Sequence, residues 1–225
     1  MSLSNHIFSK ETPLKVNMNY QLYLPYDDGI NRESKYPLIV FLHGVKKRGE
    51  DISLLDNYGL TWIAEGKSDF PFIIVTPQCP TDSNWVEEFH CVKALVDEMI
   101  MNYPVDAERV YLTGFSMGGN GTWDFASRAP ELFSAVVPIS GWFEPGQANL
   151  LKDIPIWAFH CVDDDVVRVS GTEDMVRSIT KIGGNIKATY YSELGHSHKV
   201  MEETYNNQEL YTWLLKHKRN EPFGG

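Results

Sequence analysis

The chain has 225 residues, of which 43% are hydrophobic, 22% charged and 12% aromatic. These proportions exclude a disordered or fibrous chain, and a chain of this length buries enough surface to form a core without disulfides or metals. The formal charge of -10 repels phosphate backbones and anionic membranes, so we expect no nucleic-acid partner.

Cysteine content and hydropathy indicate the compartment. The three cysteines, Cys79, Cys91 and Cys161, are too few and too odd in number for a disulfide framework, so we expect reduced, buried thiols. No stretch approaches the ~18 apolar residues of a membrane span. The first six residues also lack the charged start and apolar run of a secretory signal. The sequence therefore predicts a cytoplasmic protein without a membrane span.

Hydrophobic periodicity predicts strands and helices in alternation. Segment 16–24 alternates apolar and polar residues, which is typical of an edge or antiparallel strand. Later short apolar runs are typical of strands buried on both faces. In chain order, the predicted elements are strand 16–24, strand 38–42, helix 53–64, strand 72–75, helix 87–101, strand 110–113, helix 117–128, strand 135–139, strand 154–159, helix 173–182, strand 186–191 and helix 201–215.

Strands that alternate with helices over this length indicate an α/β fold with a mainly parallel central sheet flanked by helices. No repeat, low-complexity tract or linker marks a boundary, so we predict a single domain over 1–225 with a core at about 16–215. In such sheets ligands bind at the carboxyl ends of the strands, and the chemistry is sought there.

The turn between strand 110–113 and helix 117–128 contains a Gly-x-Ser-x-Gly pattern, Gly114 to Gly118. Between a strand and a helix this pattern predicts a nucleophile elbow, in which glycines allow a strained turn that exposes the hydroxyl of Ser116. The alternative is a serine in an ordinary tight turn.

A serine hydroxyl needs a base to remove its proton and a carboxylate to orient that base, and in this fold the chain order is Ser, Asp or Glu, then His. The acidic run 163–165 follows strand 154–159, and His196 follows strand 186–191. Both therefore stand at strand ends, where a triad needs them. A solvated loop and a surface histidine remain the alternatives.

Several stretches of the chain resemble the α/β-hydrolase esterases of the dienelactone-hydrolase, phospholipase/carboxylesterase and feruloyl-esterase kind. The resemblance runs from about Tyr20 to Leu215 and implies an α/β-hydrolase fold. The stretches that carry it are Phe-Leu-His-Gly-Val-Lys-Lys-Arg-Gly-Glu-Asp at 41–51, Pro-Gln-Cys-Pro at 77–80 with Trp85, Gly-Phe-Ser-Met-Gly-Gly at 114–119, Gly-His at 195–196 and Glu-Leu-Tyr-Thr-Trp-Leu at 209–214.

The resemblance implies which aspartate is the acid. The family pattern His-Gly-x-x-Asp falls on 160–164 and selects Asp164. Because Cys161 stands where the family has glycine, the register stays open by one residue, and Asp163 and Asp165 are the alternatives.

The resemblance also implies the base and the oxyanion hole. The base corresponds to His196, with His198 as a rival, and the backbone N–H groups of Val45 and Met117 would hold the oxyanion. His43 precedes the glycine turn and is expected to order that loop; a catalytic role for it is the alternative.

The substrate pocket is predicted to be shallow and open. Only residues 141–151 connect two strands where many lipases carry a helical lid, so the lid is minimal. Trp85, Trp142 and Phe143 fall in loops near the nucleophile, where exposed aromatic rings could hold a phenyl ring or a sugar face. Capping of the core is the alternative for all three.

Two charged features have competing interpretations. The basic run 46–48 could bind an anionic part of a substrate or could be solvated turn charges, with Arg48 at a family position that looks structural. His196 and His198 beside three aspartates could suggest a metal site. A single His-x-His is common, however, so we expect neither a metal nor a cofactor.

The predicted function is a serine carboxylesterase that hydrolyses small-molecule esters through Ser116, His196 and Asp164 and an acyl-enzyme. Its activity should rise with pH through about 6.5, where a histidine loses its proton. The alternatives are a feruloyl or acetyl esterase acting on plant polysaccharide esters, an acyl-thioester or lysophospholipid hydrolase, and a hydrolase-fold binding protein with a silent site.

Overall fold

The computed structural model describes residues 1–10, 16–25, 34–67 and 69–219. Its strands form one eight-stranded sheet. They are β1 Ser2–Lys10, β2 Val16–Leu24, β3 Tyr36–Leu42, β4 Ile73–Pro77, β5 Val105–Phe115, β6 Ala135–Ile139, β7 Ile156–Cys161 and β8 Ile186–Tyr191. The order across the sheet is β1-β2-β4-β3-β5-β6-β7-β8; β2 pairs antiparallel with β1 and β4, and all other neighbours are parallel.

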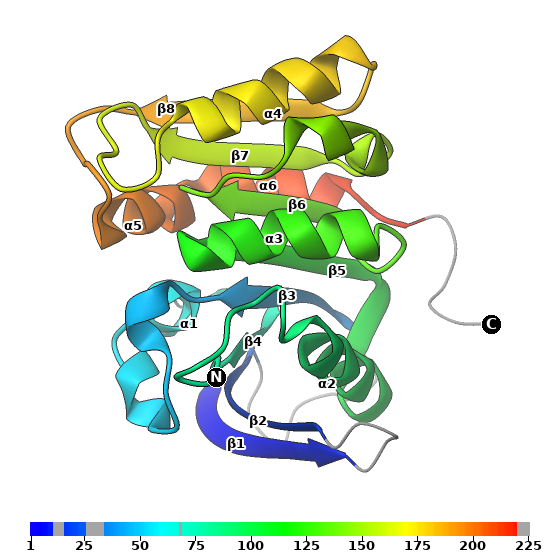
Figure 1. The fold of residues 1–225 in the computed structure, drawn as a ribbon. Helices are drawn as coiled ribbons and strands as arrows, with labels where there is room; N and C mark the ends of the chain where they lie inside the picture. The colour runs from blue at the N-terminus through cyan, green and yellow to red at the C-terminus, as the bar shows by residue number, and fades with distance from the viewer. Residues whose placement is uncertain (11–15, 26–33, 68, 220–225) are drawn as a thin grey trace.

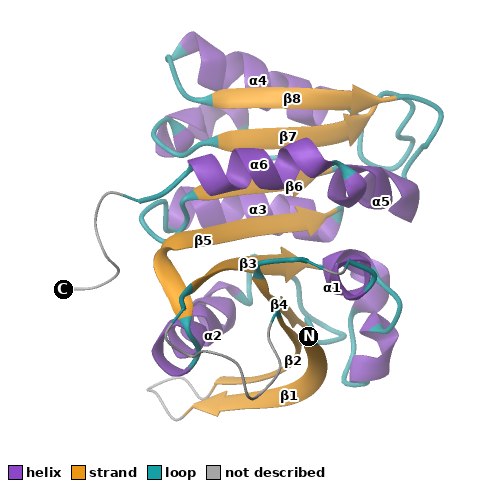
Figure 2. Ribbon diagram, turned by 180° about the vertical axis from the view of Figure 1, so that it is seen from behind, coloured by secondary structure: helices purple, strands orange, loops and turns teal. Residues whose placement is uncertain are grey.

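Helices cover both faces of this sheet. They are the 3-10 helices η1 Val45–Lys47, η2 Ile52–Leu55 and η3 Pro145–Leu151, and the α-helices α1 Gly59–Glu65, α2 Phe89–Asn102, α3 Met117–Arg128, α4 Ser170–Lys181, α5 His198–Asn206 and α6 Gln208–Lys216. Helices α2, α3 and α4 lie on the face turned to the viewer in Figure 1. Helices α1, α5 and α6 lie on the other face, as Figure 2 shows. The predicted α/β fold with a mainly parallel sheet is confirmed.

Strand β3 shows why the central strands contain few polar residues. Its side chains alternate between two buried cores: Leu38, Val40 and Leu42 join the core under α2 and α3, whereas Ile39 and Phe41 join the core under α1 and α5. Since both faces are covered by helices, both sets of side chains must be apolar.

The amino-terminal edge of the sheet differs from the prediction. Segment 2–10 forms β1, which pairs along its whole length with β2, from Ser2 opposite Leu24 to Lys10 opposite Val16. Strand β2 is therefore antiparallel, as predicted, but it is not the edge. The polar residues that alternate along β1 gave no continuous apolar signal, because one face of an edge strand is open to solvent.

Two predicted helices are each divided in the structure. Segment 53–64 becomes η2 and α1, because Asn57, between them, and Gly59, the first residue of α1, have φ of 54° and 71°, far from the helical value, so a continuous helix cannot run through them. Segment 201–215 lies within α5 and α6, which meet at Asn207; its side chain accepts the N–H of Glu209 and so caps the second helix. Strand 154–159 is β7, displaced two residues toward the carboxyl end.

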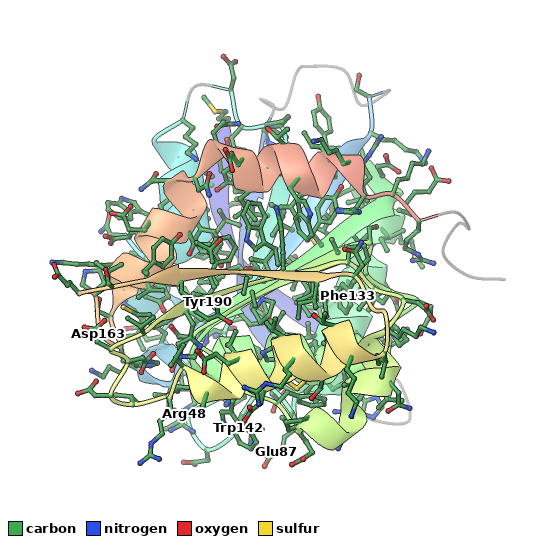
Figure 3. All side chains as sticks on the ribbon, turned by 90° about the horizontal axis from the view of Figure 1, so that it is seen from above. Arg48, Glu87, Phe133, Trp142, Asp163 and Tyr190 are labelled. Atoms are coloured by element: carbon green, nitrogen blue, oxygen red, sulfur yellow. The ribbon has the colours of Figure 1, made fainter. Side chains whose placement is uncertain are left out.

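The carboxyl ends of the parallel strands all lie on the same side of the molecule. In Figure 3, Asp163, which follows β7, lies on this side, and Phe133, which precedes β6, lies on the opposite side, where the strands begin. All three cysteines are free; Cys79 and Cys161 are buried and Cys91 is half-buried. Among the described residues, no helix combines the length and the apolar composition that crossing a membrane would require.

Candidate active site

Ser116 lies between the end of β5 and the start of α3, in a turn with φ 58° and ψ −116°. Few residues other than glycine adopt such angles, and this strain persists only where the surroundings impose it. Its N–H donates to the carbonyl of Ile139 at 2.9 Å, which holds the turn against the end of β6. The geometry is that of a nucleophile elbow.

Glycines make this turn possible. A Cβ added at Gly118 would lie 1.9 Å from the carbonyl oxygen of Leu42, and one at Gly114 would lie 2.3 Å from the carbonyl oxygen of Gly118. Because glycine has no side chain at either position, the backbone of α3 can approach the ends of β3 and β5, and no larger residue would fit there. This contact fixes the height of Ser116 above the sheet.

His196 lies in the loop between β8 and α5 and contacts both Ser116 and Asp164. Its Nε2 is 2.8 Å from Oγ of Ser116, and its Nδ1 is 2.7 Å from Oδ2 of Asp164. The imidazole also stacks on the ring of Phe115, with centroids 5.1 Å apart. The structure therefore joins residues that are 80 and 32 positions apart in the chain.

The side chain of Asp164 is fully buried and held by backbone donors. Its Oδ1 accepts the N–H groups of Val166 at 3.0 Å and Val167 at 2.7 Å. An ionised carboxylate only accepts hydrogen bonds, so we assign the proton of the His196 ring to Nδ1. The lone pair of Nε2 then faces the hydroxyl of Ser116, which is the arrangement that a general base needs.

The other candidate acids and the rival histidine lie elsewhere. Asp163 accepts hydrogen bonds from the Cys161 thiol and the Glu193 N–H, and Asp165 is exposed. His198 begins α5, with its Nε2 3.8 Å from Glu202. Of the three aspartates that the sequence left open, Asp164 is the one placed against His196.

The two backbone N–H groups that the sequence predicts for the oxyanion hole both lie at the start of a helix. Val45 is the first residue of η1 and Met117 is the first residue of α3, and the first N–H groups of a helix have no acceptor within it. A Cβ added at Gly44 would lie 3.6 Å from Cβ of Ser116, so the loop before Val45 runs directly beside the nucleophile.

His43 is buried and orders this loop. Its Nε2 accepts the N–H of Cys79 at 3.0 Å, so Nδ1 must carry the ring proton, which it donates to the carbonyl of Gly44 at 2.8 Å. Burial lowers the pKa of His43 to about 4. A neutral ring fully occupied by two backbone groups fits an ordering role and leaves no atom for catalysis.

Of the two interpretations of Trp85, an exposed pocket residue is wrong, and the structure agrees with the alternative that the side chain caps the core. The side chain is only 1% exposed, and its Nε1 donates to the carbonyl of His43 at 2.8 Å. Its ring also packs edge-on against the His43 imidazole, with centroids 4.9 Å apart. Trp85 therefore supports the loop that contains Val45, and no signal in the sequence indicates this because the partner, His43, is 42 residues away in the chain.

Trp142 and Phe143 follow β6 in the connection to η3. Trp142 is 54% exposed, and its N–H donates to Oδ1 of Asn120 on α3 at 2.9 Å. Phe143 is half-buried against the core. Figure 3 shows Trp142 beside α4. Of the three predicted substrate-binding aromatics, Trp142 presents the most ring surface to solvent.

The basic run after the oxyanion loop is partly structural. Lys47 donates to the carbonyl of Leu54 at 2.7 Å and lies 4.6 Å from the centroid of the Tyr58 ring. Arg48 donates to the carbonyl of Ser83 at 2.9 Å. Lys46 is exposed and Lys47 and Arg48 are half-buried, so solvated turn charges describe Lys46, whereas Arg48 has the structural role that was expected of it.

The metal alternative finds no support within the described part of the chain, where no three His, Cys, Asp or Glu side chains are grouped as a metal site requires.

A buried residue that sequence reasoning did not select is His160. Its Nε2 is 3.4 Å from Oδ2 of Asp164, and its Nδ1 is 2.8 Å from the Thr172 hydroxyl. Burial lowers the pKa of His160.

Comparison with known proteins adds independent information. Residues 70–214 match the family model described as phospholipase/carboxylesterase. Two relatives are a bifunctional acetylxylan esterase/xylanase from Neocallimastix patriciarum, 28% identical over 79% of this chain, and acyl-protein thioesterase 1 homolog 2 from Dictyostelium discoideum, 34% identical over 49% of it. The match spans 26% of the first relative and 52% of the second.

A solved structure is similar over nearly the whole chain. The crystal structure of a thermostable esterase has a TM-score of 0.84 and 32% sequence identity, covering 96% of this chain and 63% of that one. The range matched by the family model, 70–214, contains the elbow, the acid loop and the base loop described above.

Proposed function

Because the chain belongs to the phospholipase/carboxylesterase family, we propose that it is a serine carboxylesterase with Ser116, His196 and Asp164 as its catalytic triad. The observation that carries the proposal is the single histidine ring bonded at 2.8 Å to the strained serine and at 2.7 Å to the buried carboxylate. Ser116, His196 and Asp164 come from three different loops, and the histidine lies between the serine and the aspartate, as acyl transfer requires.

The reaction follows from the placement of these groups. Oγ of Ser116 attacks the ester carbonyl carbon while Nε2 of His196 takes the hydroxyl proton, and Asp164 stabilises the resulting imidazolium. The carbonyl π electrons move to oxygen, where the N–H groups of Val45 and Met117 donate to it; one such donor is worth roughly 3–4 kcal/mol.

The tetrahedral intermediate then collapses. The carbon–oxygen bond to the alcohol breaks, and His196 returns its proton to the leaving alkoxide, which departs as the alcohol. Water repeats the sequence on the acyl-enzyme: His196 takes one proton, the hydroxide adds to the acyl carbon, and Ser116 regains its proton as the acid leaves.

The first experiment compares wild type with Ser116→Ala on p-nitrophenyl acetate and on methyl ferulate. We expect wild type to hydrolyse at least one ester and the variant to lose at least a thousandfold in kcat. A serine-directed fluorophosphonate should label wild type and not the variant. A wild type that hydrolyses neither ester and takes no label would overturn the proposal and favour a binding protein.

The exposed ring of Trp142 favours an aromatic or carbohydrate ester as the preferred substrate class, that is, a feruloyl or acetyl esterase. The acetylxylan esterase named above is consistent with this candidate, and the acyl-protein thioesterase relative keeps a thioester alternative. Comparing methyl ferulate, p-nitrophenyl acetate and an acyl thioester by kcat/KM separates the three.

We also propose that residues 1–225 form one catalytic domain, with a core at about 16–215, in a reducing compartment such as the cytoplasm. Within the described residues, one sheet joins the strands from β1 to β8, and the three free cysteines support a reducing setting. The expected partner is a small, uncharged ester rather than nucleic acid.

A further inference from the structure

Next to the buried Asp164, a second carboxylate bonds the loop that carries the base. Oδ1 of Asp163 accepts the thiol proton of Cys161 at 2.7 Å and the N–H of Glu193 at 3.0 Å. The sulfur of Cys161 in turn accepts the N–H of Leu194 at 3.4 Å. The pair Cys161 and Asp163, which we name the loop latch, thus binds two consecutive backbone donors just before His196.

In the loop that the latch holds, Leu194 packs against the core, whereas Glu193 is exposed. Glu193 and Gly195 have φ of 63° and 56°, and a Cβ added at Gly195 would find no atom within 4 Å. Space around Gly195 is therefore open, and hydrogen bonds such as that from the Ser197 hydroxyl to the carbonyl of Leu194 at 2.8 Å add to the packing of Leu194 in holding the loop. Hydrogen bonds from backbone N–H groups to a carboxylate are stronger than those to a neutral acceptor.

We propose that Asp163 is a positioning residue for the esterase reaction, which fixes the loop 193–195 so that the ring of His196 stays between Ser116 and Asp164. This inference rests on the proposed function. Figure 3 shows Asp163 at the carboxyl end of the sheet, where the loops after β7 and β8 meet. Misplacement of a reacting group by about 1 Å can cost a hundredfold in rate, so loss of the latch should lower kcat rather than weaken binding.

The charge state of Asp163 supports the role. The Cys161 thiol, followed by the backbone N–H groups of residues 163, 193 and 195, lowers the pKa of Asp163. The side chain is therefore a carboxylate throughout the range in which an esterase works, although it is exposed.

The test compares Asp163→Ala with Asp165→Ala on p-nitrophenyl acetate, with active sites counted by fluorophosphonate titration. Asp165 is the matched control, because it adjoins Asp164, has the same charge, and forms no hydrogen bond within the part of the chain that the structure describes. We expect kcat per titrated site to fall about tenfold in Asp163→Ala with KM within twofold, and both constants to stay within twofold of wild type in Asp165→Ala.

Two further measurements separate positioning from general structure. Asp163→Asn keeps an acceptor oxygen for the Glu193 N–H and should recover kcat to within about threefold of wild type. Hydrogen exchange at the amides of Glu193 and Leu194 should be at least tenfold faster in Asp163→Ala, and this needs no substrate. If Asp163→Ala does not fold, Cys161→Ala, which removes the sulfur from both bonds, should lower kcat about threefold and speed exchange at Leu194.

The outcomes are distinguishable. Unchanged kcat and unchanged exchange in Asp163→Ala overturn the positioning role, and so does an equal loss in Asp165→Ala, which would mean that charge alone matters. A wild type that hydrolyses no ester overturns the proposed function, while the exchange measurement still decides whether the latch holds the loop.

Discussion

The two sides of the site are built by different contacts. On the nucleophile side, formed by residues 42–45 and 114–119, backbone meets backbone: a Cβ at Gly118 would meet the carbonyl of Leu42 at 1.9 Å, and a Cβ at Gly119 would meet that of Ile139 at 2.5 Å. On the acid–base side, formed by residues 161–167 and 193–196, two loops are joined through side chains, with Asp163 and Asp164 each bonded to backbone donors.

This difference predicts how each side fails. Backbone contacts between core elements leave no room for an added atom, so damage on the nucleophile side should unfold the protein. Side-chain hydrogen bonds on surface loops can be removed one at a time, so damage on the acid–base side should lower the rate while the fold persists. The predictions below test this contrast.

The largest effect should come from Gly118→Ala. The added methyl group cannot be placed without moving α3 away from β3, because its nearest neighbours are backbone atoms of Leu42. We expect a loss of more than about 4 kcal/mol in the free energy of unfolding and little folded protein, measured by thermal unfolding and soluble yield. Gly66→Ala is the matched control: its φ is −75° and the nearest atom to the added Cβ is 3.6 Å away. A Gly118→Ala protein as stable as Gly66→Ala would contradict the contrast.

Asp164→Asn should damage the other side without unfolding the chain. The amide can keep one oxygen toward the N–H groups of Val166 and Val167, but its NH2 then faces His196 and forces the ring proton onto the wrong nitrogen. We expect kcat to fall about a thousandfold or more, with a loss of roughly 1–3 kcal/mol in stability. Steady-state kinetics and urea unfolding on the same preparation decide this. Retention of a tenth of the activity would remove Asp164 from the proposed triad.

The nucleophile side should also carry a pH dependence of stability. Folded His43 stays neutral down to about pH 4, whereas an unfolded histidine takes up a proton near 6.5. Between these values the unfolded state binds more protons, so the free energy of unfolding falls as pH falls through this window, by about 3 kcal/mol. His160, whose pKa burial also lowers, acts in the same direction.

Urea unfolding between pH 7 and 4 measures this loss, and NMR titration of the His43 ring identifies its source. The expected result is a ring with the proton on Nδ1 that does not titrate near 6.5. A His43→Gln variant, whose amide can both accept and donate, should be less sensitive to acid. A ring that titrates near 6.5 in the folded protein would show that the oxyanion loop is not closed around it.

The same contrast explains which parts of the site could be predicted from the sequence. On the nucleophile side, Gly114, Ser116 and Gly118 lie between an apolar run and a helical pattern, and this spacing of glycines indicates that backbone packs against backbone. The predicted bounds of this helix, 117–128, agree with those of α3. On the acid–base side, three consecutive aspartates differ only in which way each side chain points. Periodicity holds no information on that choice, and the geometry of the loops after β7 and β8 decides it.

Other parts could not be predicted because they depend on partners distant in the chain. The sequence left Trp85 open between the pocket and the core, because the acceptor of its indole N–H, the carbonyl of His43, lies 42 residues earlier. Strand β1 is defined by pairing with β2 rather than by its own apolar content. The break at Asn207 follows from a local cap that leaves the helical periodicity on both sides intact.

The smallest effect should come from Trp142, which lies between α3 and α4. Its N–H donates to Asn120 on α3, and its Cβ lies 2.6 Å from where a Cβ on Gly171 of α4 would stand, so the backbone at this position is fixed while the ring stays exposed. Trp142→Ala should leave stability and the triad unchanged. It should raise KM for methyl ferulate about three- to tenfold, because a stacked ring pair is worth roughly 0.5–1.5 kcal/mol, and leave KM for p-nitrophenyl acetate within threefold. Trp62→Ala, which removes an exposed tryptophan from α1, is the control for loss of indole surface. Equal changes in the two variants, or a fall in kcat without a rise in KM, would mean that Trp142 acts through the loop rather than on the substrate.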